Sequence, residues 1–163
     1  MIVTINTDAS FSQKHQIGSF AFWIVCNEFR ILKSGILKSN VVRPELAEFK
    51  CIVNAFHTLF NQDIRGIKKI IVNTDCLNVI HVINDSKPEI SRYKLGFLKE
   101  VLKPYKKIIS KHPSVTIEFR HVRSHTGKGD ARSYVNEWCD TEAKKKIREK
   151  LEALNKPNLN NEN

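Results

Sequence analysis

The sequence lacks the features that mark zinc-thiolate, membrane and secreted proteins. Its 163 residues include four cysteines, at positions 26, 51, 76 and 139, with no CxxC pair and no zinc-ligand spacing. It contains no run of about 18 apolar residues, the length that a membrane-spanning helix needs. The first residues lack the basic start and small-residue cleavage site of a secretory signal. We therefore expect a cytoplasmic protein with buried, reduced thiols and no membrane association.

The composition is that of one globular domain with an excess of positive charge. Hydrophobic residues make up 41% and charged residues 27%, and the net charge is +10. Residues 99–150 hold 14 of the 27 Lys and Arg against 7 of the 17 Asp and Glu. A basic half attracts polyanions because neutralised phosphates release condensed counterions. Lysines that only keep a protein soluble would give the same composition. The charge thus favours a nucleic-acid partner without identifying its type.

Five segments carry strand patterns. Residues 2–7 alternate Ile and Val with Thr and Asn, and residues 18–25 are rich in aromatic and β-branched side chains. A third strand is predicted over residues 29–37, and the short connections between these three favour an antiparallel meander. Residues 68–72 and 115–122 give two further strands.

Helical patterns alternate with the later strands. Pro44 opens the first helix, and its apolar side chains recur at spacings of three and four: Leu46, Phe49, Val53, Phe56 and Phe60. Residues 76–84 predict a second helix. Residues 91–111 are also helical, but Pro104 either kinks that helix or begins a new one. Residues 134–154 predict the last helix.

The order β-β-β-α-β-α-α-β-α predicts an α/β fold. Three meander strands followed by β-α-β crossovers imply one five-stranded mixed sheet, a three-strand antiparallel meander plus two parallel strands, flanked by helices. Gly- and Ser-rich residues 124–133 are expected to form a loop. We expect a single domain over residues 1–154 and a disordered Asn-rich tail over residues 155–163.

Two aspartates follow predicted strands. We expect Asp8 to end the first strand and Asp75 to end the strand that contains Ile70-Ile71-Val72. If these strands are neighbours, their carboxylates lie close together and repel, and a divalent cation is the usual remedy. Either aspartate alone would also suit a turn or a helix cap.

Other acidic residues and one histidine have both functional and plain interpretations. Glu45 and Glu48 lie in the first turns of a helix, where acids also stabilise the helix dipole. Asp140 lies inside the last predicted helix and is either a solvated group or an inward ligand. His125 opens a Gly-rich loop, where it could move protons or simply lie at the surface.

Five fragments together resemble the ribonuclease H family in its bacterial-type form. They are T-D-A-S at the first strand, A-E-F-K-C-I in the first helix, N-T-D-C-L-N-V-I at the fourth strand, V-R-S-H-T-G, and N-E-W-C-D-T-E-A. The resemblance covers roughly residues 2–150, with all fragments in order. It implies a ribonuclease H domain, a hydrolase that cuts the RNA strand of an RNA–DNA hybrid by two-metal-ion hydrolysis.

The resemblance also implies a set of site residues. Four carboxylates would hold two divalent ions, preferably Mg²⁺ with Mn²⁺ as a substitute: Asp8, Glu48, Asp75 and Asp140. His125 would assist departure of the leaving group or release of product. Four further residues fall where the family has substrate-binding or nearby polar residues: Ser10, Asn40, Arg43 and Asn136. The partner would be an RNA–DNA hybrid, bound by a monomer.

Two features set this chain apart from the better-known bacterial members. The loop between His125 and Asp140 is longer, and Leu77 stands where many members carry a polar contact residue. For the helix ligand, Glu45 lies in R-P-E-L and Glu48 in A-E-F-K-C-I. We favour Glu48, because choosing Glu45 would turn Glu48 inward as an unpaired charge. Two alternative functions stay open, a junction resolvase or similar nuclease on the same fold and a catalytically silent hybrid-binding module.

Overall fold

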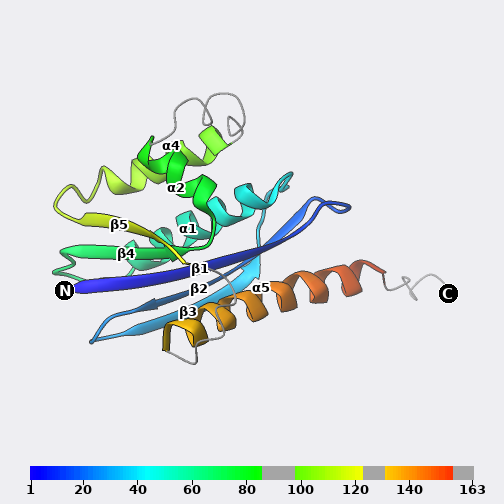
Figure 1. Ribbon diagram of the computed structural model, residues 1–163, viewed down its shortest axis with the longest axis horizontal. Helices are drawn as coiled ribbons and strands as arrows, with labels where there is room; N and C mark the ends of the chain where they lie inside the picture. The colour runs from blue at the N-terminus through cyan, green and yellow to red at the C-terminus, as the bar shows by residue number, and fades with distance from the viewer. Residues whose placement is uncertain (86–97, 123–130, 156–163) are drawn as a thin grey trace, which may run out of the picture.

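The computed structural model describes residues 1–85, 98–122 and 131–155, and Figure 1 shows their arrangement. Five strands form one sheet: β1 (Ile2–Ser12), β2 (Ile17–Val25), β3 (Arg30–Ile36), β4 (Lys69–Thr74) and β5 (Thr116–His121). The helices of these described ranges are α1 (Pro44–Phe60), α2 (Leu77–Asn84), α4 (Lys99–Ile109) and α5 (Ala131–Asn155).

The sheet is mixed, with strand order β3-β2-β1-β4-β5. β1 pairs with β2 and β2 pairs with β3 in antiparallel fashion, whereas β4 lies parallel to both β1 and β5. The predicted α/β fold, a meander plus two parallel strands, is confirmed. The β1–β4 ladder stops at Asn6↔Asn73, although β1 continues along β2 as far as Ser12↔Ile17. The two central strands therefore separate just before the predicted acidic residues.

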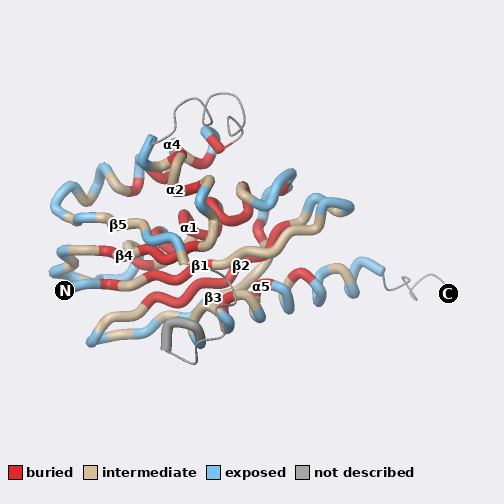
Figure 2. Tube along the Cα trace, viewed as in Figure 1, coloured by how far each residue is buried: buried red, intermediate tan, exposed pale blue. Residues whose placement is uncertain are grey.

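Helices cover both faces of the sheet. Figure 1 shows α1, α2 and α4 on one side and α5 alone on the other. The larger core lies between the sheet and α1, and most side chains on the sheet-facing side of α1 are buried in it. A smaller cluster lies under α5: Ala21, Trp23, Cys139 and Ala143. Figure 2 shows the buried residues concentrated along the central strands and α1.

The connection from β3 to α1 is anchored on the start of β2. The backbone N–H of Leu37 donates to the Gly18 carbonyl at 2.8 Å, and that of Val41 donates to the Gln16 carbonyl at 2.9 Å. A Cβ at position 18 would lie 2.8 Å from the side chains of Leu37 and Val41. Only glycine allows this close approach, which positions the segment that carries Asn40 and leads into α1.

Two predictions about element boundaries are wrong. Asp8 does not end the first strand but lies within β1, because antiparallel pairing with β2 continues after β4 diverges. α5 begins at Ala131, three residues before the predicted start, because the Gly and Ser content of residues 124–133 favoured a loop in the sequence pattern. Of the two alternatives for Pro104, the structure has the first, because Pro104 lies inside α4 and does not begin a new helix. The expected tail falls almost entirely outside the described residues.

The four cysteines are all free thiols. Cys51 and Cys139 are buried as expected, whereas Cys26 and Cys76 are only half-buried. In the described part of the chain, no helix is both long and apolar enough to cross a membrane.

Candidate active site

Three carboxylates from three elements meet at the point where β1 and β4 separate. Asp8 comes from β1, Glu48 from the second turn of α1, and Asp75 from the residue after β4. One carboxylate oxygen of each lies within 4.8 Å of those of the other two. Glu48 is buried, with 9% of its surface exposed, and the two aspartates are half-buried. The sequence therefore places three like charges in a space where water is scarce.

Few hydrogen bonds compensate these charges. The backbone N–H of Ala9 donates to Asp8 Oδ1 at 2.8 Å and to Glu48 Oε1 at 3.0 Å, so one donor serves two carboxylates. Glu48 Oε2 is buried and has no hydrogen-bond partner. A buried carboxylate oxygen without a donor is costly unless a proton or a cation satisfies it.

The crowding shifts the acidities in the same direction. Burial, and then repulsion from Asp75 and Asp140, raises the pKa of Asp8 to about 7. Burial, followed by repulsion from Asp8 and Asp75, raises the pKa of Glu48 well above its ordinary value. Both shifts favour the uncharged forms of Asp8 and Glu48, as expected for carboxylates that share a small space.

The fourth predicted carboxylate lies beside this group but not within it. Asp140, on α5, raises the pKa of Asp8 by repulsion, so the two are near neighbours. It is not one of the three residues whose oxygens lie within 4.8 Å. Its Oδ1 and Oδ2 both lie 2.8 Å from Nζ of Lys144, one turn further along α5. The structure therefore brings together three of the four predicted ligands and pairs the fourth with a lysine.

The three clustered residues fit a hard divalent cation. All their donor atoms are carboxylate oxygens, the ligands that Mg²⁺ prefers over thiolate or imidazole. The orphaned Glu48 Oε2 and the raised pKa of Asp8 both indicate negative charge that Lys144, the nearby cation, compensates only in part. A cation held here would remove the repulsion that the protein itself leaves in place.

Glu45 lies outside this cluster. Its Oε1 accepts a hydrogen bond from Asn78 Nδ2 of α2 at 3.4 Å, and Pro44 precedes it in the first turn of α1. Of the two candidate glutamates, the structure thus brings Glu48 to Asp8 and Asp75. That Glu48 is a metal ligand stays a prediction.

The remaining predicted residues are not members of the carboxylate cluster. Ser10 lies on β1 two residues beyond Asp8 and is half-buried. Asn40 and Arg43 are exposed in the connection that leads into α1. Asn136 lies one turn before Asp140 on α5 and is half-buried. His125 lies outside the described residues.

The surroundings of the cluster include residues that the sequence did not single out. His121, the last residue of β5, lies with Nε2 3.0 Å from the Asp75 carbonyl oxygen. The parallel register Thr74↔His121 brings it there, and only a correct strand alignment would have revealed it. Asn6 and Asn73 form a buried side-chain hydrogen bond beneath the two aspartates.

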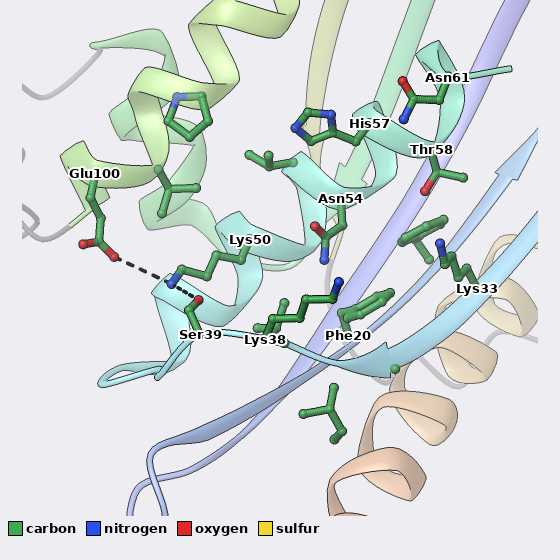
Figure 3. Close-up of a pocket in the computed structure, with 17 residues that line it drawn as sticks. Phe20, Lys33, Lys38, Ser39, Lys50, Asn54, His57, Thr58, Asn61 and Glu100 are labelled. Atoms are coloured by element: carbon green, nitrogen blue, oxygen red, sulfur yellow. Dashed lines mark hydrogen bonds and ion pairs between the residues drawn. The ribbon is translucent and has the colours of Figure 1, made fainter.

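A separate cavity of about 780 Å³ lies away from the acidic cluster, between β3, α1 and α4. Figure 3 shows Lys33 and Lys38 on one side of it and Lys50 and His57 on α1. Lys50 Nζ donates a hydrogen bond to Ser39 Oγ at 2.8 Å and lies 3.7 Å from Glu100 Oε1. None of the clustered carboxylates lines this cavity, so its volume has no part in the site described above.

Comparison with protein families gives a match over most of the chain. The family model described as RNase H matches residues 1–148. No curated protein sequence matches the chain.

Solved structures share the fold at low identity. LC11-RNase H1, isolated from compost by a metagenomic approach, is 16% identical, with a TM-score of 0.67 over 91% of this chain and 97% of that one. The same enzyme in complex with an RNA/DNA hybrid gives 13% identity and a TM-score of 0.64, over 91% and 99% of the two chains. The N-terminal RNase H domain of Rv2228c from Mycobacterium tuberculosis is 11% identical, with a TM-score of 0.66 over 94% of this chain and 98% of that one. At these identities the likeness shows the fold alone.

Proposed function

This chain belongs to the ribonuclease H family, and from that premise we propose that it is an endonuclease that hydrolyses the RNA strand of RNA–DNA hybrids with divalent metal ions. The meeting of Asp8, Glu48 and Asp75 within 4.8 Å is the observation that supports this proposal most strongly. A hybrid-binding module without catalysis would have no reason to keep three mutually repelling carboxylates.

The metal ion we propose is Mg²⁺, in two sites, with Mn²⁺ able to substitute. When bound, such ions activate a water for in-line attack and relieve charge on the leaving oxygen. Asp8, Glu48 and Asp75 would hold them through carboxylate oxygens, and Asp140 would complete the set. The Ala9 N–H orients one oxygen each of Asp8 and Glu48, which leaves their other oxygens available. Positioning of the scissile phosphate is then the main contribution of the protein.

The proposed substrate is an RNA–DNA hybrid duplex. LC11-RNase H1, which shares the fold, has been crystallised with such a hybrid. Specificity for a hybrid would come from contacts to 2′-hydroxyl groups on one strand and from backbone contacts on the other. We assign these contacts to Ser10, Asn40, Arg43 and Asn136. The exposed positions of Asn40 and Arg43, on a segment anchored by Gly18, suit that role.

His125 is proposed to assist leaving-group departure or product release. Replacement of His125 by Ala should slow turnover and leave metal binding unchanged. A general acid–base group typically contributes about 10²–10⁴-fold, and a residue that only assists release contributes less. Single-turnover and steady-state rates, measured together, separate the two roles. Wild-type rates in both assays would show that His125 has no part in the reaction.

The direct test of the proposed function uses labelled duplexes. Purified protein should cleave the RNA strand of an RNA–DNA hybrid in Mg²⁺, and should leave RNA–RNA and DNA–DNA duplexes intact. Cleavage of branched DNA instead would favour a junction resolvase, and hybrid binding without cleavage would favour a silent module. That the protein is a cytoplasmic monomer with its catalytic domain over residues 1–154 stays a prediction.

A further inference from the structure

The two aspartates stand just past the point where the backbones of β1 and β4 stop pairing. The parallel ladder runs from Ile2↔Lys69 to Asn6↔Asn73. Asp8 and Asp75 each lie two residues beyond that last pair. From there β1 continues along β2, and β4 ends at Thr74. Ladder hydrogen bonds between β1 and β4 therefore do not hold the two carboxylates at their separation.

Side chains tie the strands together at this fork. Asn73 Nδ2 donates to Asn6 Oδ1 at 2.8 Å, across the last register pair. Thr7 Oγ1 donates to the Asn73 carbonyl oxygen at 3.4 Å. Asn6 and Asn73 are 4% and 5% exposed, so water does not compete for the amide bond. Because side chains alternate along a strand, Asn6 lies on the same face of β1 as Asp8.

This amide pair is expensive for the fold. It lies on the α5 side, where Asn6 neighbours Trp23 in the register and Cys139 Sγ lies 3.6 Å from the Asn6 carbonyl oxygen. The side chains of a small apolar cluster lie on that face, among them Trp23 and Cys139, and Asn73 Oδ1 is buried without a hydrogen-bond partner. A buried polar atom left unpaired costs about 1–3 kcal/mol, whereas two apolar side chains would carry no such cost. Stability alone does not account for amides at this position.

Electrostatic repulsion between Asp8 and Asp75 gives the amide pair a role beyond stability. One carboxylate oxygen of Asp8 lies within 4.8 Å of one of Asp75, and like charges at that separation repel each other. Such repulsion pushes apart two strand ends that no longer share backbone hydrogen bonds. A directional side-chain bond one step before the carboxylates opposes that separation, as outer-shell hydrogen bonds orient metal ligands elsewhere.

We propose that Asn6 and Asn73, helped by Thr7, form a clamp that holds β1 and β4 together at the fork and so keeps Asp8 and Asp75 at the separation a divalent ion requires. These are positioning residues that act through the aspartates. The inference rests on the proposed function, because it assumes that the clustered carboxylates bind metal.

The test separates metal binding from stability with apolar replacements. Asn6→Leu and Asn73→Leu each leave a buried amide without its partner, so both single variants should unfold at lower temperature. The double variant Asn6→Leu/Asn73→Leu removes both amides and should regain most of the lost stability. Its affinity for Mn²⁺, measured by isothermal titration calorimetry without substrate, should nevertheless be about 10-fold or more weaker than wild type.

Controls distinguish failure of the clamp from failure of the site. Ile108→Val, a core truncation on α4, should lower the melting temperature without changing Mn²⁺ affinity. Asp8→Asn should abolish tight Mn²⁺ binding. If it binds Mn²⁺ like wild type, the proposed site is wrong and the clamp with it. If Asp8→Asn loses Mn²⁺ binding but the double Leu variant binds Mn²⁺ like wild type, the clamp alone is overturned. Should that variant not fold, Thr7→Val decides, because wild-type affinity there overturns the clamp as well.

Discussion

At the scale of single residues, Asp8 is the centre of the site. It shares the Ala9 N–H with Glu48 and is repelled by both Asp75 and Asp140. We predict that Asp8→Asn or Asp75→Asn abolishes cleavage of the hybrid and leaves hybrid binding largely intact. The change removes charge without changing shape, so phosphate contacts elsewhere should survive. Cleavage of labelled hybrid in Mg²⁺ and binding measured in Ca²⁺ check the two halves of this prediction.

A matched acid outside the cluster provides the control for these substitutions. Glu118 on β5 pairs with Lys69 and Arg120 and takes no part in the carboxylate group. Glu118→Gln should therefore cleave at nearly the wild-type rate. Substantial Mg²⁺-dependent activity in Asp8→Asn or Asp75→Asn would contradict the carboxylate site.

The two glutamates of α1 allow an equally direct comparison. Glu48 is buried with one oxygen orphaned, whereas Glu45 accepts a hydrogen bond from Asn78 at the edge of α2. Glu48→Gln should lose activity in Mg²⁺, and Glu45→Gln should keep most of it. The reverse result would mean that α1 presents a different residue to the metal and that the family alignment of this helix is shifted by three positions.

At the scale of elements, α5 combines a candidate ligand with a basic surface. Lys144, Lys145 and Lys146 follow Asp140 and pair with acids on the same helix: Asp140, Glu142 and Glu149. Exposed pairs of this kind are weak, typically about 0.2–1 kcal/mol, so a phosphate can displace them. The three lysines therefore remain available to a nucleic-acid backbone.

We predict that replacing these three lysines with Gln weakens hybrid binding without changing which strand is cut. Each lysine that neutralises a phosphate in the complex should, when replaced, reduce the slope of log K against log salt by about 0.9 on the duplex-DNA scale. Binding measured at several salt concentrations gives that slope. An unchanged slope would show that this face of α5 points at solvent in the complex. Lys111→Gln, just past the end of α4, is the matched control.

An element could be predicted from the sequence where local signals define it, and could not where pairing with distant segments does. α1 was predictable because its apolar stripe and Pro44 are local signals, and in the structure the helix begins at Pro44 as predicted. The extension of β1 past Asp8 was not, because it depends on pairing with β2 and has no mark in residues 8–12 themselves. The contact of His121 with Asp75, and the amide pair of Asn6 and Asn73, depend on strand register. Register is a tertiary property that a single sequence does not reveal.

At the scale of the whole molecule, the fold places a group of mutually repelling carboxylates beside the central strand of its sheet. β1 is the central strand, covered by α1 on one face and α5 on the other. The clustered carboxylates come from β1, α1 and the end of β4, so a cation bound there would connect the sheet with α1. Metal binding and global stability should therefore be linked.

Proton binding at Asp8 is linked to stability in the same way, and the direction of its effect can be measured. The pKa of Asp8 is raised from 3.8 to about 7, so the folded state binds its proton more tightly than the unfolded state does. The metal-free fold is therefore favoured below about pH 4 by this group and loses that contribution as the pH rises to about 7. Glu48 shifts in the same direction. Asp8→Asn removes the Asp8 contribution, so the variant should resist the loss.

We therefore predict that the melting temperature of Asp8→Asn minus that of wild type, measured in EDTA, increases between about pH 4 and pH 7 and then levels off. Each kcal/mol should correspond to about 2–4 °C for a chain of this size. At pH 7.5, adding Mg²⁺ should raise the melting temperature of wild type and leave that of the variant nearly unchanged, because the cation replaces the proton that wild type has lost. Glu118→Gln should respond to Mg²⁺ as wild type does. Parallel pH curves for wild type and Asp8→Asn would show that Asp8 is not held in a repulsive site, and an equal response of both to Mg²⁺ would place the cation elsewhere.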